Sequence, residues 1–164
     1  MKYLVRDKIL ALGDDSRIED EDGRYAFLVD GKALRLRDTF ELKDPEGRIL
    51  ITVREKVLSL RDSMTLERDG RRLAVVRRKR LSLLRNHFLV TLVDGTELDV
   101  SGRILDREFT IAYDGELLAH VSRKWFELRE TYAVELVREE TDPALFLTVA
   151  VCVIRMAEKD REAG

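Results

Sequence analysis

A short segment recurs six times along this chain, at intervals of about 24 residues. Each copy has a basic residue followed by alternating apolar positions, as in Lys32-Ala-Leu-Arg-Leu-Arg-Asp38 and Lys56-Val-Leu-Ser-Leu-Arg-Asp62. The copies start at residues 8, 32, 56, 79, 103 and 124, and the copy at Arg103 is the most degraded. A fixed period of this length indicates a repeated supersecondary unit, which limits the fold more than any local motif does.

Turn signals lie between the copies and separate runs in which apolar and polar residues alternate. These signals are Asp22-Gly23, Asp30-Gly31, Glu46-Gly47, Asp69-Gly70, Asp94-Gly95 and Asp114-Gly115. Asp-Gly favours a tight hairpin because both central residues need positive φ. Glu46-Gly47 follows Pro45, which predicts a wider loop there. Alternation with a period of two predicts half-buried strands on both sides of each turn.

Repeated strand pairs of this kind predict about twelve antiparallel strands over residues 3–138. A sheet of that width rarely stays open, because closure removes its unpaired edges. The closed form would be a barrel too wide for its own side chains to fill. We therefore predict a mainly β protein with a closed barrel and a separate apolar filler, and we expect any irregularity of the wall at the copy that starts at Arg103.

Residues 142–156 break the alternation and are the candidate filler. From Ala144 to Ile154 only Thr148 is polar. Asp142 is a favourable N-cap and Pro143 a favourable first helical residue, which predicts a central helix over about 143–156. The β-branched content also suits a buried strand. The helix is favoured because a helix that is apolar all round must be buried. The run is shorter than the roughly 20 apolar residues that cross a bilayer.

Composition predicts one domain over residues 1–157, followed by a polar tail at 158–164. Charged residues make up 38% of the chain while the net charge is only −2, so no overall field attracts nucleic acid or anionic membranes. The single cysteine excludes an internal disulfide framework and fits a reducing compartment. No apolar run follows Lys2 and Arg6, so we expect no signal peptide. We expect a cytoplasmic location, including the periphery of a membrane.

These features resemble the LURP-one-related family, which belongs to the tubby C-terminal-like group together with the phospholipid scramblases. The resemblance covers Tyr3 to Ile154 and is carried by the six units, by Lys124-Trp125-Phe126 and by the Asp142-Pro143-Ala-Leu run. It implies a twelve-stranded barrel around a central C-terminal helix. Tubby proteins bind phosphoinositides and scramblases move phospholipids. The chain lacks the Cys-rich region, the Pro-rich segment and the membrane span of scramblases, so the resemblance does not extend to lipid scrambling.

The strongest charge feature is the basic stretch from Arg68 to Arg85, which contains only one acid, Asp69. Several cations near an anionic surface contribute about 1 kcal/mol each. The candidate lipid- or anion-binding residues are Arg71, Arg72, Arg77, Lys79 and Arg123. The alternative is a solvated outer face of the barrel. Side chains alternate along a strand, so at most half of the run 77–80 can join one patch.

The other polar residues predict no chemistry. The acidic stretch 14–22 lacks the spacing of a calcium loop and suits a solvated or ion-paired surface. His87 and His120 are the only histidines, and no G-x-S-x-G motif or Cys/His cluster accompanies them or a serine such as Ser122. Cys152 lies in the apolar run, where it acts as a small hydrophobe. We expect no catalytic residues, no metal and no cofactor.

Two functions fit this sequence. The first is a non-enzymatic barrel that binds phospholipid headgroups or membrane surfaces through basic side chains. The second is a protein-interaction or scaffold module with no lipid partner. An enzyme or small-ligand carrier would need an open cavity at the mouth of the barrel, which the buried helix would close. The sequence predicts neither the physiological partner nor the oligomeric state.

Overall fold

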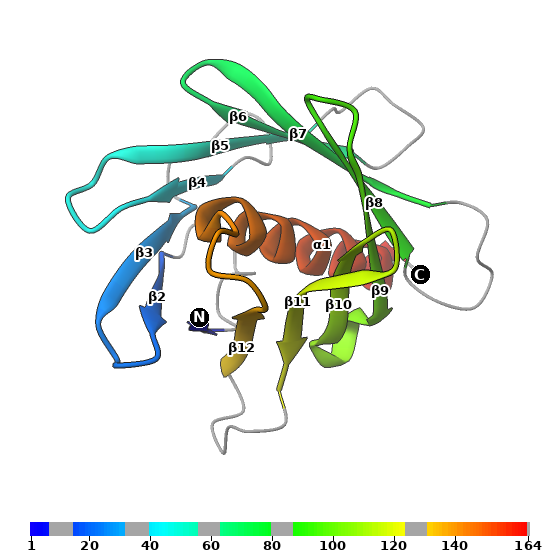
Figure 1. Cartoon of the computed structure of the whole chain (residues 1–164). Coiled ribbons are helices and arrows are strands. Elements are labelled where there is room, and N and C mark those ends of the chain that lie inside the picture. Colours follow the sequence, from blue (N-terminus) through cyan, green and yellow to red (C-terminus); the bar gives the residue numbers. More distant parts are fainter. Residues whose placement is uncertain (7–14, 32–39, 56–62, 80–86, 124–130, 164) are drawn as a thin grey trace.

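The structure is a computed structural model, and it describes residues 1–6, 15–31, 40–55, 63–79, 87–123 and 131–163. Twelve strands in these ranges form a closed barrel (Figure 1). The strands are β1 (Lys2–Arg6), β2 (Ser16–Asp20), β3 (Tyr25–Asp30), β4 (Phe40–Lys43), β5 (Ile49–Glu55), β6 (Ser63–Arg68), β7 (Arg71–Arg78), β8 (His87–Leu92), β9 (Glu97–Arg103), β10 (Glu108–Tyr113), β11 (Glu116–Ser122) and β12 (Thr131–Leu136). Each strand pairs antiparallel with its sequence neighbour, and β1 pairs with β12 to close the ring.

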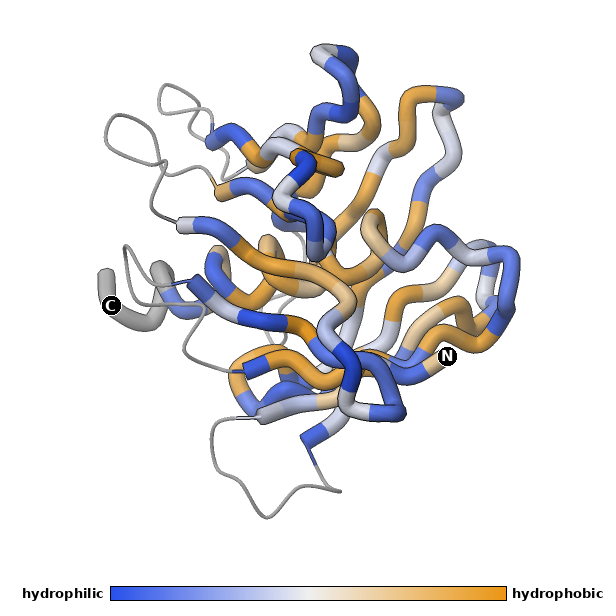
Figure 2. The backbone as a smooth tube through the Cα atoms, turned by 90° about the vertical axis from the view of Figure 1, so that its left-hand side faces the viewer, coloured by the Kyte–Doolittle hydropathy of each residue, from blue (hydrophilic) through white to orange (hydrophobic). Residues whose placement is uncertain are grey.

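The wall follows the alternation of the sequence. On β5, Ile51 and Val53 are buried while Leu50 and Thr52 are half-buried. On β8, Phe88 and Val90 are buried between more exposed neighbours. Figure 2 shows the same alternation as orange and blue segments along the strands, with blue concentrated at the hairpin turns. This period of two confirms the predicted half-buried strands.

Helix α1 (Pro143–Ala163) passes through the barrel (Figure 1). Leu147, Cys152 and Val153 are each fully buried although they point to different sides of the helix, so the barrel wall surrounds it. The hydroxyl of Thr148 donates to the Ala144 carbonyl over 2.7 Å, which satisfies this buried polar group. The central helix is therefore confirmed over the strand alternative.

The helix begins at Pro143 as predicted, but its end was placed too early. It continues from residue 156 to Ala163, so part of the segment predicted as a polar tail is helical. Residues 157–163 (Ala-Glu-Lys-Asp-Arg-Glu-Ala) are mostly good helix formers. Adding residues to an existing helix is favourable because the costly first turn has already formed.

The turns are partly as predicted. Asp69-Gly70 and Asp114-Gly115 are two-residue hairpin loops in which both residues have positive φ, 52° and 74° in the first and 48° and 78° in the second. The 44–48 turn is wider, as its proline predicted, with the Gly47 N–H donating to the Asp44 carbonyl over 3.0 Å. The turns at 20–24 and 92–96 have the same backbone pattern, so these two Asp-Gly pairs lie in wider loops.

The prediction of a hairpin at Asp30-Gly31 is wrong. Asp30 pairs with Glu41, so residues 31–39 connect β3 to β4. The register places Val29 opposite Leu42, and both side chains are buried in the core. The burial of these apolar residues sets the register more strongly than a local turn preference does.

The two ends of the barrel differ. One end, which we call the turn end, holds the hairpin turns 20–24, 44–48, 69–70, 92–96 and 114–115 and the segment 137–142 that leads into α1. The opposite end, which we call the helix end, holds the last turns of α1 and the 3₁₀ helix η2 (Ile104–Asp106).

The degraded repeat copy that starts at Arg103 lies in the described chain and forms η2 at the helix end, followed by Arg107 with φ 58°. Just before it, Gly102 has φ 137°, and an added Cβ would lie 2.6 Å from the Glu108 carbonyl oxygen. Only glycine fits there, because the two strands come too close for a side chain. The other five copies, apart from Lys79, lie outside the described residues.

Candidate functional site

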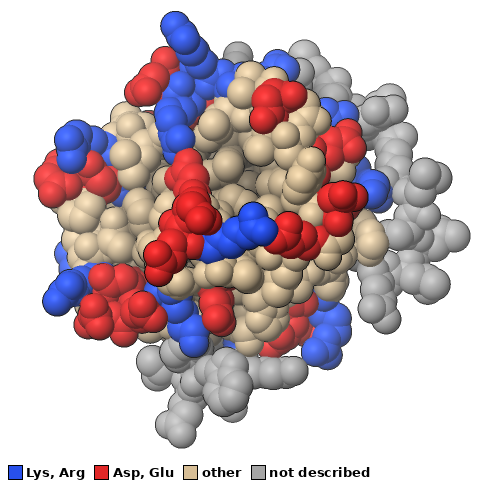
Figure 3. All heavy atoms as spheres, viewed as in Figure 1, with Lys and Arg blue, Asp and Glu red and all other residues tan. Residues whose placement is uncertain are grey.

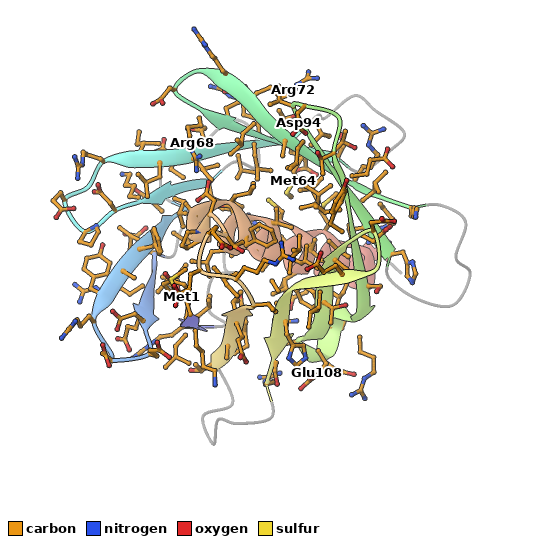
Figure 4. The ribbon with its side chains drawn as sticks, viewed as in Figure 1. Met1, Met64, Arg68, Arg72, Asp94 and Glu108 are labelled. Carbon is orange, nitrogen blue, oxygen red and sulfur yellow. The ribbon has the colours of Figure 1, made fainter. Side chains whose placement is uncertain are left out.

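An open hollow of about 400 Å³ lies beside the turn that joins β6 to β7. Its described lining consists of Arg68, Asp69, Arg71, Arg72 and Leu73. Figure 4 labels Arg68 and Arg72 on this hairpin. Figure 3 shows Lys and Arg side chains rising over the same region at the top of the molecule, with acidic side chains directly beside them. This is the candidate site.

A β-bulge follows the two arginines on β7. Leu66 pairs with Ala74 but Glu67 pairs with Arg72, so the register shifts and Leu73 is the additional residue. Bulges bend a strand and redirect its side chains. Arg71 and Arg72 precede the bulge and lie next to the two-residue turn, where both are exposed.

Arg68 is tied to the start of the helix. Its guanidinium lies 2.8 Å from the Asp142 carboxylate, and the other oxygen of that carboxylate accepts a hydrogen bond from the Leu145 N–H over 3.4 Å. Both side chains are about one-third exposed, so the pair itself contributes at most about 1 kcal/mol. Its effect is positional: the hollow is attached to the N-terminus of α1.

Arg71 and Arg72 have no carboxylate within ion-pairing distance among the residues that the structure describes. Asp94 lies on the neighbouring turn, where it accepts the Thr96 N–H over 2.9 Å, and this hydrogen bond holds the pKa of Asp94 below its usual range. Guanidinium groups bind phosphate and carboxylate through paired N–H donors. The hollow is therefore lined by two guanidinium groups with no described carboxylate partner.

The charge around the hollow limits what it can attract. Segments 20–24, 44–48, 93–97, 113–117 and 137–142 have formal charges of −2, −1, −2, −2 and −2, whereas segment 68–72 has +2. The β6–β7 turn is thus a local cationic site in an acidic ring. An extended anionic surface would be repelled by the rest of the ring, but a single anion at the hollow would not.

The structure brings together only two of the five predicted binding residues, Arg71 and Arg72. Arg77 is half-buried near the other end of β7, which spans eight residues and thus roughly 23 Å. Lys79 forms an ion pair with Asp99, with 3.1 Å between the ammonium nitrogen and the carboxylate oxygen. Arg123 lies beside Glu108, which accepts its backbone N–H over 3.2 Å. Whether any of the five binds an anion stays a prediction.

Arg68, which lines the hollow, and its partner Asp142 were not among the predicted binding residues. Arg68 pairs directly with Arg71 across the two-residue turn, which the Asp69-Gly70 hairpin signal would have indicated. The contact of Arg68 with Asp142 had no local signal, because the two residues are 74 positions apart.

A second polar cluster lies on the outside of β10 and β11. The half-buried Glu108 carboxylate accepts the Ser122 hydroxyl over 3.3 Å and lies 3.9 Å from Nε2 of His120. A serine nucleophile would need its hydroxyl to donate to a base that a third group orients. Here the hydroxyl donates to the carboxylate itself, so the cluster holds two strands together and is not arranged as a catalytic triad.

The other singled-out residues have structural roles. Burial raises the pKa of the Cys152 thiol far above its usual range, which keeps it unreactive. In the acidic stretch, Asp20 accepts the N–H groups of Asp22 and Arg24 over 2.9 Å each. Within the described ranges, no three His, Cys, Asp or Glu side chains are grouped to hold a metal ion. No helix in that part of the chain is long and apolar enough to cross a membrane.

Comparisons with known proteins agree with this architecture. The family model described as LURP-one-related matches residues 1–154. A protein of Arabidopsis thaliana solved by X-ray crystallography is similar in structure, with a TM-score of 0.69, 18% sequence identity and coverage of 95% of this chain and 91% of that one. At this identity the likeness concerns the fold. No curated protein matches the chain.

Proposed function

This chain belongs to the LURP-one-related family, and on that premise we propose that it is a non-enzymatic tubby-like barrel that binds a phosphate-bearing headgroup at the β6–β7 hollow. We also propose that the protein is cytoplasmic and binds the headgroup at a membrane surface. One observation carries it: the consecutive residues Arg71 and Arg72 are both exposed and both line a hollow, at the one positively charged turn among the segments compared above.

The acidic ring makes the proposal more specific than general attraction to membranes. Binding should depend on the phosphate group that enters the hollow and not on the overall negative charge of the bilayer. The headgroup of a phosphoinositide presents such a phosphate away from the bilayer plane, whereas the charge of phosphatidylserine lies close to it. We therefore expect a preference for phosphoinositide over phosphatidylserine at equal surface charge.

Flotation with vesicles tests this preference. One vesicle set contains phosphatidylcholine with a phosphoinositide, the second contains phosphatidylserine at matched charge, and inorganic phosphate is added as a soluble competitor. Arg71→Gln with Arg72→Gln should weaken recovery on the first set roughly 30-fold, from about 1 kcal/mol for each cation. If inorganic phosphate displaces the protein from the phosphoinositide vesicles, the phosphate group is the feature that the protein recognises.

The matched control is Arg6→Gln with Arg24→Gln, which removes two exposed arginines away from the hollow. This control should bind as the parent does. The proposal is wrong if neither the phosphoinositide vesicles nor phosphate bind, or if the Arg71/Arg72 double variant binds as tightly as the parent. Equal recovery on both vesicle sets would show that charge alone is recognised.

A further inference from the structure

Large apolar side chains are exposed at the turn end of the barrel. Among the described residues these are Met1, Ile49, Val93, Tyr113, Leu117 and Val137. Three of them lie on the ends of neighbouring strands: Tyr113 ends β10 and is 47% exposed, Leu117 starts β11 and is 41% exposed, and Val137 follows β12 and is 53% exposed. We call these three residues the apolar rim.

The three residues of the apolar rim lie at adjoining strand ends. Leu117 pairs with Ala112, the residue before Tyr113, and the Val137 N–H donates to the Leu118 carbonyl over 3.0 Å. Neighbouring strands are about 4.8 Å apart, so the three side chains extend over about 10 Å. Leu118 is partly buried and packs against the core, which joins the rim to the interior. Isolated exposed apolar residues are ordinary, but a contiguous group with polar surroundings marks an interaction site.

The surroundings of the apolar rim are acidic. Segments 113–117 and 135–140 contain Asp114, Glu116, Glu135, Glu139 and Glu140 against a single cation, Arg138, which is paired with Glu116. Asp114, Glu139 and Glu140 are exposed, and no cation within the described ranges pairs with them. Figure 3 shows red side chains outnumbering blue ones across the centre of the face that Figure 1 presents.

From this arrangement we infer that the apolar rim docks a short basic segment of a partner protein, whose apolar side chains cover Tyr113, Leu117 and Val137 while its Lys or Arg residues meet the surrounding acids. An anionic membrane is disfavoured as the occupant because the same acids repel its headgroups. A second copy joined rim to rim would face like charges across its two-fold axis. Three side chains are also few compared with the 20–30 residues that each partner contributes to a standard protein interface.

The rim is independent of the headgroup site. It lies on β10, β11 and the residue after β12, whereas the arginine hollow lies on β6 and β7, four or more strands away around the barrel from β11. Each site can therefore be lost without the other. A protein that carries both would respond to a headgroup through one wall of its turn end and to a peptide through another.

Fluorescence anisotropy with two labelled synthetic peptides tests the inference. In one peptide three Leu residues alternate with Arg, and in the other the same Leu residues alternate with Glu. We expect saturable binding of the Arg peptide alone. Leu117→Ser with Val137→Ser should weaken it about tenfold or more, because each aliphatic side chain loses its burial against the peptide. Glu139→Gln with Glu140→Gln should weaken it about threefold to tenfold, with a lower dependence on salt.

The control is Ile49→Ser, which removes a side chain that is as exposed as Val137 but lies on β5, directly across the twelve-stranded ring from β11. Thermal melts establish that each variant is folded. The inference is overturned if the parent binds neither peptide, if the Glu peptide binds equally, or if Ile49→Ser weakens binding as much as Leu117→Ser with Val137→Ser does. Recovery of the parent on anionic vesicles that is lost in that double variant would assign the rim to membranes instead.

Discussion

The arginines at the start and at the end of α1 have different environments, although both groups come from the same charged sequence. At the start, Arg71 and Arg72 are exposed, and Arg68 shares the partly exposed Asp142. At the end, the Arg107 side chain is only 4% exposed and lies 2.6 Å from the Glu158 carboxylate of α1. It also donates to the Leu105 carbonyl over 3.0 Å.

Two further arginines fasten the helix end. Arg78 donates to the Met156 carbonyl over 3.3 Å, and its guanidinium lies 5.2 Å from the centre of the Phe88 ring. The guanidinium of Arg155 lies 5.5 Å from the centre of the Phe40 ring. Cation–π contacts of this kind stabilise by roughly 0.5–2 kcal/mol. The difference shows that arginine at the helix end is part of the packing, whereas Arg71 and Arg72 at the turn end are exposed.

The largest effect should come from the helix between these two ends. Val151→Asp places an unpaired charge at the centre of the barrel, where Val151 is almost fully buried. Burying an unpaired carboxylate costs several kcal/mol, which is comparable to the whole stability of a domain. We expect loss of the cooperative melt by circular dichroism, while Val93→Asp, at an exposed valine, melts normally. A Val151→Asp variant with normal stability would show that the helix does not fill the barrel.

The next effect separates the two groups of arginines directly. Arg107→Ala should reduce the free energy of unfolding by about 2–3 kcal/mol, because it removes a buried side chain with its packing and leaves the partly buried Glu158 without its partner. Arg71→Ala should change it by less than about 0.5 kcal/mol, as surface substitutions do. Urea unfolding followed by fluorescence measures both. If the two variants lost equal stability, the distinction between structural and available arginines would not hold.

A smaller effect is expected where the hollow meets the helix. Asp142→Ala removes both the N-cap of α1 and the partner of Arg68, and should cost about 1 kcal/mol, as other N-cap replacements do. Asp142→Asn keeps the cap but removes the charge, so it should retain most of that stability. Because Arg68 is released in both variants, both should bind phosphate at the hollow at least as well as the parent. Weaker phosphate binding in Asp142→Asn would indicate that the ion pair positions the site.

The smallest expected effect is the loss of stability at acidic pH. Although burial opposes ionisation of Asp44, the N–H and guanidinium of Arg48 hold its pKa below the ordinary value of 3.8. A carboxylate whose pKa is lower in the folded state stabilises the fold at pH values above its unfolded-state pKa. This stabilisation is lost as the pH falls through the folded-state pKa. The melting temperature should therefore begin to fall below about pH 4. Asp44→Asn should reduce this acid-dependent fall, and an unchanged profile would show that the turn carboxylates contribute nothing to it.

Much of the fold could be predicted from local patterns. The repeated strand pairs and the run from Ala144 to Ile154 predicted the closed barrel and its central helix, because period-two alternation and an all-apolar segment have few folded solutions. The predictions of a turn at Asp30-Gly31 and of the end of α1 were wrong for physical reasons. A buried pairing of Val29 with Leu42 overrode the first, and propagation of an existing helix overrode the second.

The candidate site was less predictable. The charge of the 68–85 stretch indicated where cations are, and alternation limited which of them share a face. It could not tell that Lys79 pairs with Asp99 or that Arg71 and Arg72 both line a hollow at the end of the hairpin. The sequence contained no signal for the apolar rim. The exposure of a side chain at the end of a strand depends on which neighbouring strands continue past it.

Sequence alone therefore determined the family, the ring of hairpins and the central helix, since each depends on the order of apolar and polar residues along the chain. The tertiary structure decided which charged residues are buried or ion-paired and which are exposed. Arg107 and Arg71 are the same residue type, and they differ because the partner of Arg107, Glu158, lies 51 residues away and is brought to it by the path of the helix through the barrel. Electrostatic partners are set by distance in space, which a local pattern does not contain.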